Sequence, residues 1–386
     1  MTHFSSAASQ HPDISLSLHG PADLVAAVPF LLGFEPEQCI VAVFLNSDDG
    51  RVVVTMRVDE PPAAASADFC HFWRNQCEQV AAHNSVGRVV LVSYGSRESN
   101  LTTSTTDSGD DSAPNYSMPI HSDSDTDESL SMQLLMAALA NESEEVGLLV
   151  CDQLHVSRGR WRSLLCSDNE CCPPTGNDID EARRNRIAAE FVHEGIAVLS
   201  DRTEIAEQLA ALPETDSKVI EFRQLLADKQ RELNELPVAG EVDLTSIRVK
   251  HLEGIVALLP AGDRGVVAAA VVAFAETRLR DGLLHMLTQT LPVEDRRKVE
   301  THLSVATRMV SPSYCAPTAT VVAGLAWQRG DGALAMAALK LALASDPTYS
   351  LARLLQRAID RAVPPQVWVD AIANTTVQEC LVGVAA

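Results

Sequence analysis

The stretch LHGPADLVAAVPFLLGFEPEQCIVAVFL, residues 18–45, contains two apolar runs of different character. The first run, 22–32, follows Pro21 and predicts a helix. Pro29 lies inside that run and costs a helix interior about 3 kcal/mol, so we expect the helix to kink or break just before it. The second run, 38–45, is rich in β-branched residues and predicts a strand that is buried on both faces. The stretch therefore predicts a helix that leads into an interior strand.

Glycine spacing argues against a nucleotide site in this stretch. A dinucleotide fingerprint needs G-x-G-x-x-G directly between a strand and a helix, with an acidic residue about twenty positions further on. Here Gly20 stands alone, and Pro21 removes a backbone N–H from the turn that would hold phosphate. The phosphate-loop pattern G-x-x-x-x-G-K-[ST] is also absent from the sequence. We therefore expect no nucleotide, and the sequence points to no other cofactor.

Apolar patterning in the first half of the chain predicts a mixed sheet of about six strands. The predicted strands are 13–18, 38–45, 51–59, 87–95, 146–152 and 158–166. The polar residues 46–50 make the second and third of these a hairpin. Helical spacing at 63–83 then predicts a strand–helix–strand unit whose strands run parallel, with a right-handed connection. Further helices are predicted at 131–139 and 178–193.

The length of 386 residues favours two domains, at roughly 150 residues for each. We predict an α/β domain over residues 12–200, a charged helical connector over 201–248 and an all-α domain over 249–380. From Leu252 onward, helices alternate with breaks at Gly and Pro residues, and no strand pattern is convincing. A degenerate tetratricopeptide-like hairpin is predicted there from the offsets of Gly330, Ala335, Leu339, Ala342, Leu343 and Pro347.

Residues 96–129 differ in composition from the rest of the first domain. Ser, Thr, Asp and Asn dominate this segment, and few of its residues are large and apolar. Such a segment cannot bury enough apolar surface to offset the entropy lost on folding. We therefore predict a disordered acidic insert that interrupts the domain.

The formal net charge of −22 opposes binding to nucleic acid or to an anionic membrane, because both depend on Lys and Arg. No apolar run approaches the length of a membrane span, and the first residues show no basic and apolar leader pattern. We therefore expect a cytoplasmic protein that binds neither nucleic acid nor membrane. Its nine cysteines would then be reduced thiols.

Four ordered blocks of the chain resemble one known family. They are LHGPADLVAAVPFLLGFEPEQCIVAVFL (18–45), RVDEPP (57–62), GRWRSLLCSDNECCPPTG (159–176) and RGDGALAMAALKLALASDPTYSLARLLQRAIDRAVPPQVW (329–368). In these blocks, which extend over nearly the whole chain, the sequence resembles the actinobacterial family called domain of unknown function 4192. The resemblance implies an actinobacterial cytoplasmic protein. That family has no assigned activity, so the resemblance transfers no catalytic residue to this sequence.

Polar residues at the ends of the predicted strands are the candidates for a ligand site, because strand ends in α/β sheets converge on a crevice. The candidates are Arg57, Asp59, Tyr94, Asp152 and Arg160. An Arg and an Asp beside a cleft can bind a small anion or position a proton donor. In a second interpretation, which stays open, these residues are the ordinary polar ends of apolar runs, and their side chains form hydrogen bonds with exposed backbone groups.

Cys166, Cys171 and Cys172 lie in the loop CSDNECC. Clustered thiols suit a structural turn, a redox pair or a soft metal ion. Zinc sites usually pair cysteines about two to four residues apart, whereas two of these are adjacent and their side chains are expected to diverge. A fourth ligand, such as His155 or His193, would have to come from afar. We therefore predict no bound metal, and a disulfide from Cys166 to one of the adjacent pair on mild oxidation.

No nucleophile–base pair and no phosphate loop can be assembled from the sequence. The leading hypothesis is therefore a non-enzymatic interaction or regulatory protein that binds another protein through its acidic surface and helical domain. The alternative is a small-ligand-binding protein or enzyme with its site at the sheet edge near Asp59, Tyr94 and Asp152, modulated through the cysteine loop.

Deleting most of residues 96–129 tests the predicted insert. Since a disordered segment buries little apolar surface, the melting temperature of the deletion variant should stay nearly unchanged. Differential scanning calorimetry of the variant beside the full chain measures this difference. A fall of many degrees would show that the segment belongs to the folded core.

Overall fold

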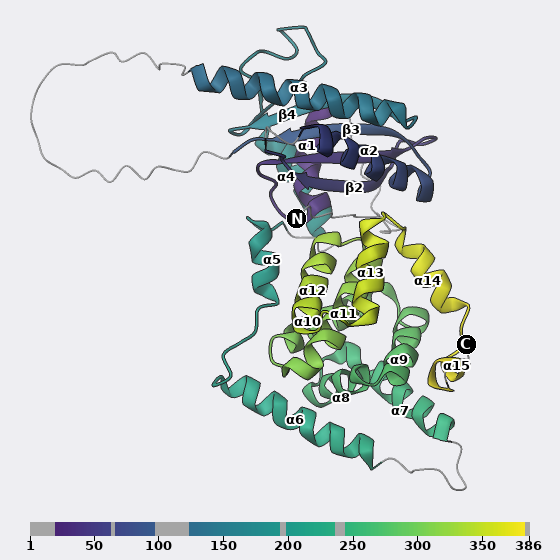
Figure 1. Cartoon of the computed structure of the whole chain (residues 1–386). Helices are drawn as coiled ribbons and strands as arrows, with labels where there is room; N and C mark the ends of the chain where they lie inside the picture. Colours follow the sequence, from purple (N-terminus) through teal and green to yellow (C-terminus); the bar gives the residue numbers. More distant parts are fainter. Residues whose placement is uncertain (1–19, 63–65, 97–122, 194–197, 236–243, 383–386) are drawn as a thin grey trace, which may run out of the picture.

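The structure, a computed structural model, describes residues 20–62, 66–96, 123–193, 198–235 and 244–382 (Figure 1). The strand predicted at 13–18 and residues 97–122 of the predicted insert lie outside these ranges. Helix α3 (Asp123–Glu145) begins inside the segment assigned to the insert. Residues 123–129 of the segment assigned to the insert are therefore helical, and the disorder of the insert stays a prediction.

Six strands form one mixed sheet in the order β2-β1-β3-β4-β5-β6. Their bounds are β1 Cys39–Asn46, β2 Val52–Asp59, β3 Val86–Tyr94, β4 Leu149–Ser157, β5 Arg160–Ser163 and β6 Asn177–Asp178. β3 and β4 are parallel, and every other neighbouring pair is antiparallel. The predicted mixed sheet is thus confirmed, although the sequence did not predict β6.

The strand–helix–strand unit has the predicted direction, but its two strands are not neighbours. α2 (Ser66–His83) joins β2 to β3, and both strands are antiparallel to β1, so they run parallel to each other. β1 lies between them because it pairs with β2 in the hairpin and with β3 along its other edge. The neighbouring parallel strands are β3 and β4, which α3 connects. The carboxyl ends of these two strands therefore lie side by side.

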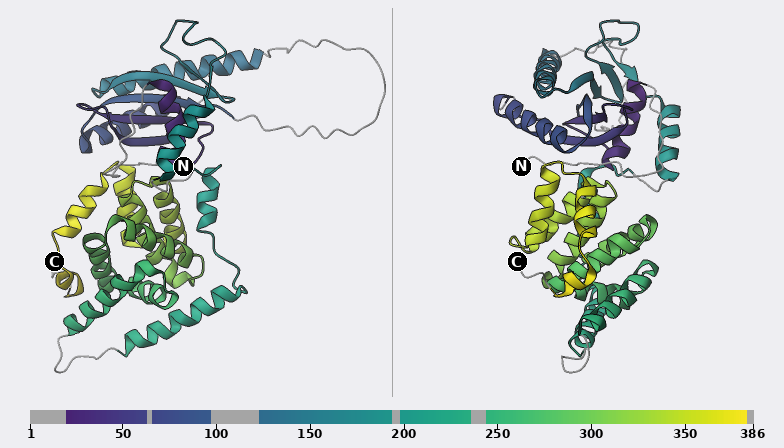
Figure 2. Two further views of the ribbon diagram at one scale, coloured as in Figure 1. Left: turned by 180° about the vertical axis from the view of Figure 1, so that it is seen from behind. Right: turned by 90° about the vertical axis from the view of Figure 1, so that its right-hand side faces the viewer.

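β1 is buried in the sheet domain over most of its length, because residues 39–44 have no exposed surface. One face of the sheet packs on α2 and α3, with Ile40 of β1 and Trp73 of α2 in the shared core. The other face packs on α1 (Pro21–Leu32), with Val41 of β1 in that core. α4 (Glu181–His193) packs against α1. Figure 2 shows these helices on the two sides of the sheet. The run predicted to be buried on both faces is therefore an interior strand, second in the order of the sheet.

α1 continues through Pro29 as one helix, so of the predicted kink or break the break does not occur. Pro29 has no N–H to donate to the carbonyl of Val25, and that bond is lost from the helix. Tertiary packing offsets the loss, because Val25 and Leu32 are buried against the sheet. The helix ends at Gly33, whose φ of 79° is in the left-handed region that favours glycine.

After β6, the described residues form helices and no further strand. Those beyond α4 are α5 Arg202–Gln208, α6 Ser217–Asn234, α7 Leu244–Leu258, α8 Arg264–Ala275, α9 Thr277–Thr290, α10 Val293–Thr307, α11 Pro312–Gln328, α12 Gly332–Ser345, α13 Ser350–Asp360, α14 Pro365–Ala373 and α15 Val377–Val382. Phe222 and Leu226 of α6 lie in the same core as the later helices, so part of the predicted connector packs as helical domain. α11 and α12 pack against each other, but the likeness to a tetratricopeptide unit is not confirmed. Within the described ranges, no helix is both long and apolar enough to cross a membrane.

The helical domain contacts the α1 face of the sheet domain. Ala333 and Leu334, at the start of α12, join the core around α1 together with Ile205 of α5. A hydrogen bond connects the domains at a second point, where Asn84 Nδ2 donates to the Ala362 carbonyl over 3.1 Å. Figure 1 shows α5 and α12 near the sheet domain. The two domains therefore share buried surface.

A buried hydrogen bond links the two helices that cover the other face. Trp73 Nε1 of α2 donates to Ser143 Oγ of α3 over 3.0 Å, and both side chains have no solvent exposure. Ser143 Oγ donates in turn to the Leu139 carbonyl over 2.8 Å. Because water cannot reach this position, the indole N–H depends on Ser143 for a partner.

Ser143→Ala should lower the free energy of unfolding by about 1–3 kcal/mol, because it leaves the Trp73 N–H buried without an acceptor. Urea unfolding followed by circular dichroism measures the change. Ser131→Ala, at an exposed position of the same helix, is the control and should change stability by less than about 0.5 kcal/mol. Equal effects of the two substitutions would contradict the assigned hydrogen bond.

Candidate functional site

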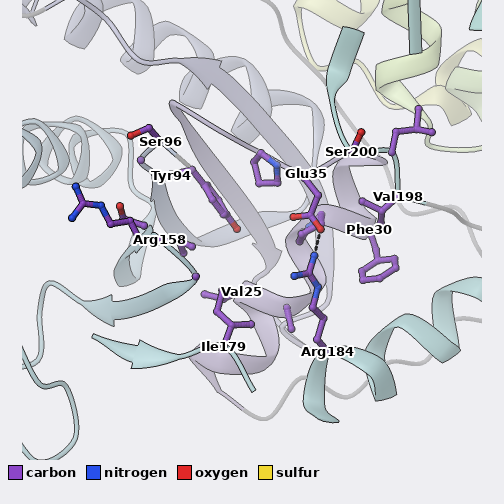
Figure 3. A pocket seen from close by; sticks show the side chains of 18 residues that line it. Val25, Phe30, Glu35, Tyr94, Ser96, Arg158, Ile179, Arg184, Val198 and Ser200 are labelled. Carbon is purple, nitrogen blue, oxygen red and sulfur yellow. Dashed lines mark hydrogen bonds and ion pairs between the residues drawn. The ribbon is translucent and has the colours of Figure 1, made fainter. Parts of the chain in front are cut away.

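A pocket of about 560 Å³ lies where the parallel strands β3 and β4 end (Figure 3). Its lining includes Tyr94 to Ser96 at the end of β3 and Val156 to Gly159 at the end of β4. The Gly95 N–H donates to the Val156 carbonyl over 2.9 Å, so the pairing continues past β3 and holds the two ends together. The carboxyl ends of parallel strands are the usual place for a ligand in an open α/β sheet.

Two segments far apart in the sequence form another wall of the pocket. Residues 33–36 follow α1, and residues 198–200 precede α5. The Glu35 N–H donates to the Leu199 carbonyl over 3.0 Å, and the Leu199 N–H donates to the Gly33 carbonyl over 3.0 Å. These paired backbone bonds fix Glu35 and Leu199 in the lining.

Apolar side chains give the pocket a preformed surface. Val25 and Phe30 of α1 line it together with Ile179 and Val198. The Phe30 ring is stacked on Phe191 of α4, with the ring centroids 5.0 Å apart. Stacking of this kind restrains the orientation of the Phe30 ring, so this part of the wall needs little rearrangement to accept an apolar group.

Tyr94 lines the pocket and carries a buried hydroxyl (Figure 3). Its side chain is 5% exposed, and the hydroxyl has no hydrogen-bond partner among the residues that the structure describes. Burial raises the pKa of Tyr94 well above its usual value, and the neighbouring Cys39 adds to this effect. The phenol is therefore protonated at neutral pH and can donate a hydrogen bond. A buried hydroxyl without a partner costs about 1–3 kcal/mol, which an acceptor on a ligand would relieve.

An ion pair between Arg184 of α4 and Glu35 also lines the pocket (Figure 3). α4 is held in place by two further arginines, because Arg183 and Arg186 lie 3.3 Å and 3.1 Å from the carboxylate of Asp23 in α1. Asp23 itself is buried, at 2% exposure. The contact between α1 and α4 therefore positions the charged part of the pocket.

The register of the sheet brings three of the predicted candidates together beside the pocket. Cys39 lies opposite Asp59 on β2 and opposite Tyr94 on β3. Arg57 is buried and pairs with Asp59, while its Nε has no partner within the described part of the chain. Burial raises the pKa of Cys39 to about 11, although the Arg57 guanidinium acts to lower it. Arg57, Asp59 and Tyr94 thus surround a thiol that stays protonated at neutral pH.

Asp152 and Arg160, the other two candidates, do not line this pocket. Asp152 Oδ1 accepts hydrogen bonds from Ser163 Oγ over 2.6 Å and from the Gln153 N–H over 2.8 Å. Arg160 Nε donates to the Gly176 carbonyl over 3.2 Å, which connects β5 to the chain before β6. Asp152 therefore lies inside β4 and not at the strand end where the sequence placed it, and Arg160 begins β5.

Cys39, Glu35 and Arg184 were not predicted as site residues. Cys39 and Glu35 lie in the opening stretch, where the break between the two apolar runs could have indicated a strand start and its preceding loop. Arg184 carries no such signal, because it is one of several charged residues in an amphipathic helix. Its place in the pocket depends on the packing of α4 against α1.

The structure brings the three cysteines of the loop together. The sulfur atoms of Cys166, Cys171 and Cys172 all lie within 4.8 Å of one another, and no His, Asp or Glu of the described residues joins this group. The expectation that the adjacent side chains diverge is wrong, because their sulfur atoms are 3.9 Å apart. Hydrogen bonding with Cys172 and then Cys166 raises the pKa of Cys171 to about 11. His155, considered above as a fourth ligand, does not join the cluster and forms a hydrogen bond between Nδ1 and Ser93 Oγ over 2.9 Å.

Tyr94→Phe should raise the free energy of unfolding of the ligand-free protein by about 1 kcal/mol, because it removes a buried hydroxyl that has no partner in the described structure. Tyr314→Phe is the matched control, since Tyr314 donates to Gln230 Oε1 over 3.1 Å and its loss should destabilise by about 1 kcal/mol. Urea unfolding of both variants measures the two changes in the free energy of unfolding, which should have opposite signs. A destabilised Tyr94→Phe protein would show that the hydroxyl is satisfied.

Comparison with known families confirms the resemblance seen in the sequence. Residues 21–366 match the family described as domain of unknown function (DUF4192). Comparisons with curated proteins and with solved structures give no match. The matched segment extends from the first residue of α1 into α14 and so includes both domains. The chain therefore belongs to the family of domain of unknown function DUF4192.

Proposed function

We propose that the protein binds a small molecule in the pocket at the ends of β3 and β4. The observation that carries this proposal is Tyr94, which lines the pocket and whose buried hydroxyl has no hydrogen-bond partner in the described structure. A polar group in that position is expensive unless something supplies an acceptor. This function is the alternative that the strand-end residues of the sequence suggested.

The shape and chemistry of the lining indicate the class of ligand. The volume of about 560 Å³ lies within the usual range of small-molecule sites, roughly 300–1,000 Å³. Phe30, Ile179 and Val198 would contact an apolar body, while Tyr94 would donate to an acceptor. Arg158 is exposed in the lining and favours an acceptor that carries negative charge. The proposed ligand is therefore a small carboxylic acid with an apolar group.

The groups near the pocket favour binding over covalent chemistry. Cys39 and Tyr94 are the thiol and the phenol at this end of the sheet, and burial raises the pKa of each. A protonated thiol and a protonated phenol are weak nucleophiles. The same burial leaves the Tyr94 hydroxyl suited to hydrogen bonding, so we propose recognition of the ligand without a reaction.

Several expectations from the sequence stay predictions. They are the interaction role with a protein partner, the cytoplasmic location, the actinobacterial origin and the tetratricopeptide-like hairpin. The interaction role depends on the acidic composition and on the helical domain as a whole. We favour the small-molecule role because specific residues of one pocket support it.

A thermal-shift panel of small apolar carboxylic acids and their amides tests the proposed function. At least one acid should raise the melting temperature in a saturable way, because a ligand that binds the folded state stabilises it. Its amide should bind more weakly. Tyr94→Phe should raise the dissociation constant of the acid about tenfold, since a hydrogen bond to a charged group contributes about 1.5 kcal/mol.

Tyr314→Phe serves again as the control and should leave that dissociation constant unchanged. Acids and amides that produce no shift at all would contradict the proposal. So would an acid that binds with equal affinity to the wild type and to Tyr94→Phe, because binding would then not involve the pocket hydroxyl.

A further inference from the structure

We propose that Cys166, Cys171 and Cys172 form a binding site for one zinc ion, held by three thiolates. The three sulfur atoms lie within 4.8 Å of one another in the loop that connects β5 to β6. This site is separate from the pocket and does not depend on the proposed small-molecule function. It replaces the expectation, drawn from spacing alone, that the loop holds no metal.

The distances between the sulfur atoms fit a metal better than a disulfide. Zinc–sulfur bonds of about 2.3 Å in tetrahedral geometry place the sulfur atoms about 3.8 Å apart. The sulfur atoms of Cys171 and Cys172 are 3.9 Å apart, close to that separation. A disulfide needs about 2.05 Å and joins only two sulfur atoms. It would leave the third thiol of the cluster without a role.

Backbone hydrogen bonds hold each of the three cysteines in the loop. Ser163 Oγ accepts from the Cys166 N–H over 3.2 Å while it donates to Asp152. The Cys172 N–H donates to the Asp168 carbonyl over 2.7 Å. Asn177 Nδ2 donates to the Cys171 carbonyl over 3.0 Å. The loop is therefore organised before a metal arrives, which reduces the entropy lost on binding.

Burial distinguishes the three thiols and suits a site at the protein surface. Cys172 is buried, Cys166 is half-buried and Cys171 is exposed, so an ion can enter from the side of Cys171. Because no His, Asp or Glu of the described residues joins the group, the fourth position is left for water or an external thiol. Thiolate ligands favour zinc and other soft ions over magnesium or calcium.

Zinc binding releases protons from the three thiols and changes the oxidation state of neither sulfur nor zinc. Three S–H bonds break and three S–Zn bonds form, so one Zn²⁺ replaces three protons, which pass to solvent. The occupied site carries one negative charge, from three thiolates and one divalent cation. No oxidant or reductant takes part.

Cobalt binding to the reduced, chelator-treated full chain tests the site. Co²⁺ should bind at one ion per chain and give the sulfur-to-cobalt charge-transfer absorption of thiolate ligands, and Zn²⁺ should displace it. Cys171→Ser should weaken Co²⁺ binding at least about tenfold and reduce that absorption. Because Cys171 is exposed, this substitution should not disturb the fold, which circular dichroism checks.

Cys151→Ser, at another exposed cysteine outside the cluster, is the matched control and should keep full cobalt binding. The proposal fails if the reduced chain binds neither Co²⁺ nor Zn²⁺. It also fails if Cys171→Ser binds Co²⁺ as tightly as the wild type and with undiminished charge-transfer absorption. A disulfide between Cys166 and one of the adjacent pair, in a chain that binds no metal when reduced, would establish the redox pair instead.

Discussion

The pairing of β1 with strands on both of its edges is the constraint on which the rest of the sheet domain depends. Residues 39–44 have no exposed surface, because β2 and β3 cover the edges of β1 and helices cover both faces. A shift of one residue in this register would move each side chain to the opposite face. Cys39 would then no longer lie on the α1 face with Asp59 and Tyr94 as its neighbours. The polar end of the sheet is therefore a direct consequence of how β1 pairs.

The same pairing explains why the pocket forms where it does. Since β1 separates β2 from β3, the first neighbouring parallel pair is β3 and β4, and their carboxyl ends meet at Tyr94 and Val156. α1 lies over this end of the sheet and turns at Gly33 toward the segment around Leu199. Sheet, helix and returning chain thus enclose the space around Tyr94. The charged pair of the pocket is added by α4 through its contact with α1.

Local patterns in the sequence predicted most strands and helices, because β-branched runs and Gly or Pro breaks act over a few residues. The rule that polar strand ends gather near ligands singled out Tyr94, which lines the pocket, and Arg57 and Asp59, which lie beside it. They could not predict that α1 continues through Pro29, since tertiary burial decides this. Contacts between distant segments, such as Glu35 with Arg184, could not be predicted from local patterns for the same reason. The two-residue β6 is too short for any periodic signal.

A crystallographic fragment screen of the full chain would test the central claim, that the pocket beside Tyr94 recognises a small molecule. The account predicts bound fragments between Phe30 and Tyr94, with an acceptor atom within about 3 Å of the Tyr94 hydroxyl. Acidic fragments should predominate there over neutral ones. The account would be contradicted by a screen in which fragments bind only elsewhere and the Tyr94 hydroxyl donates to a group of the protein itself.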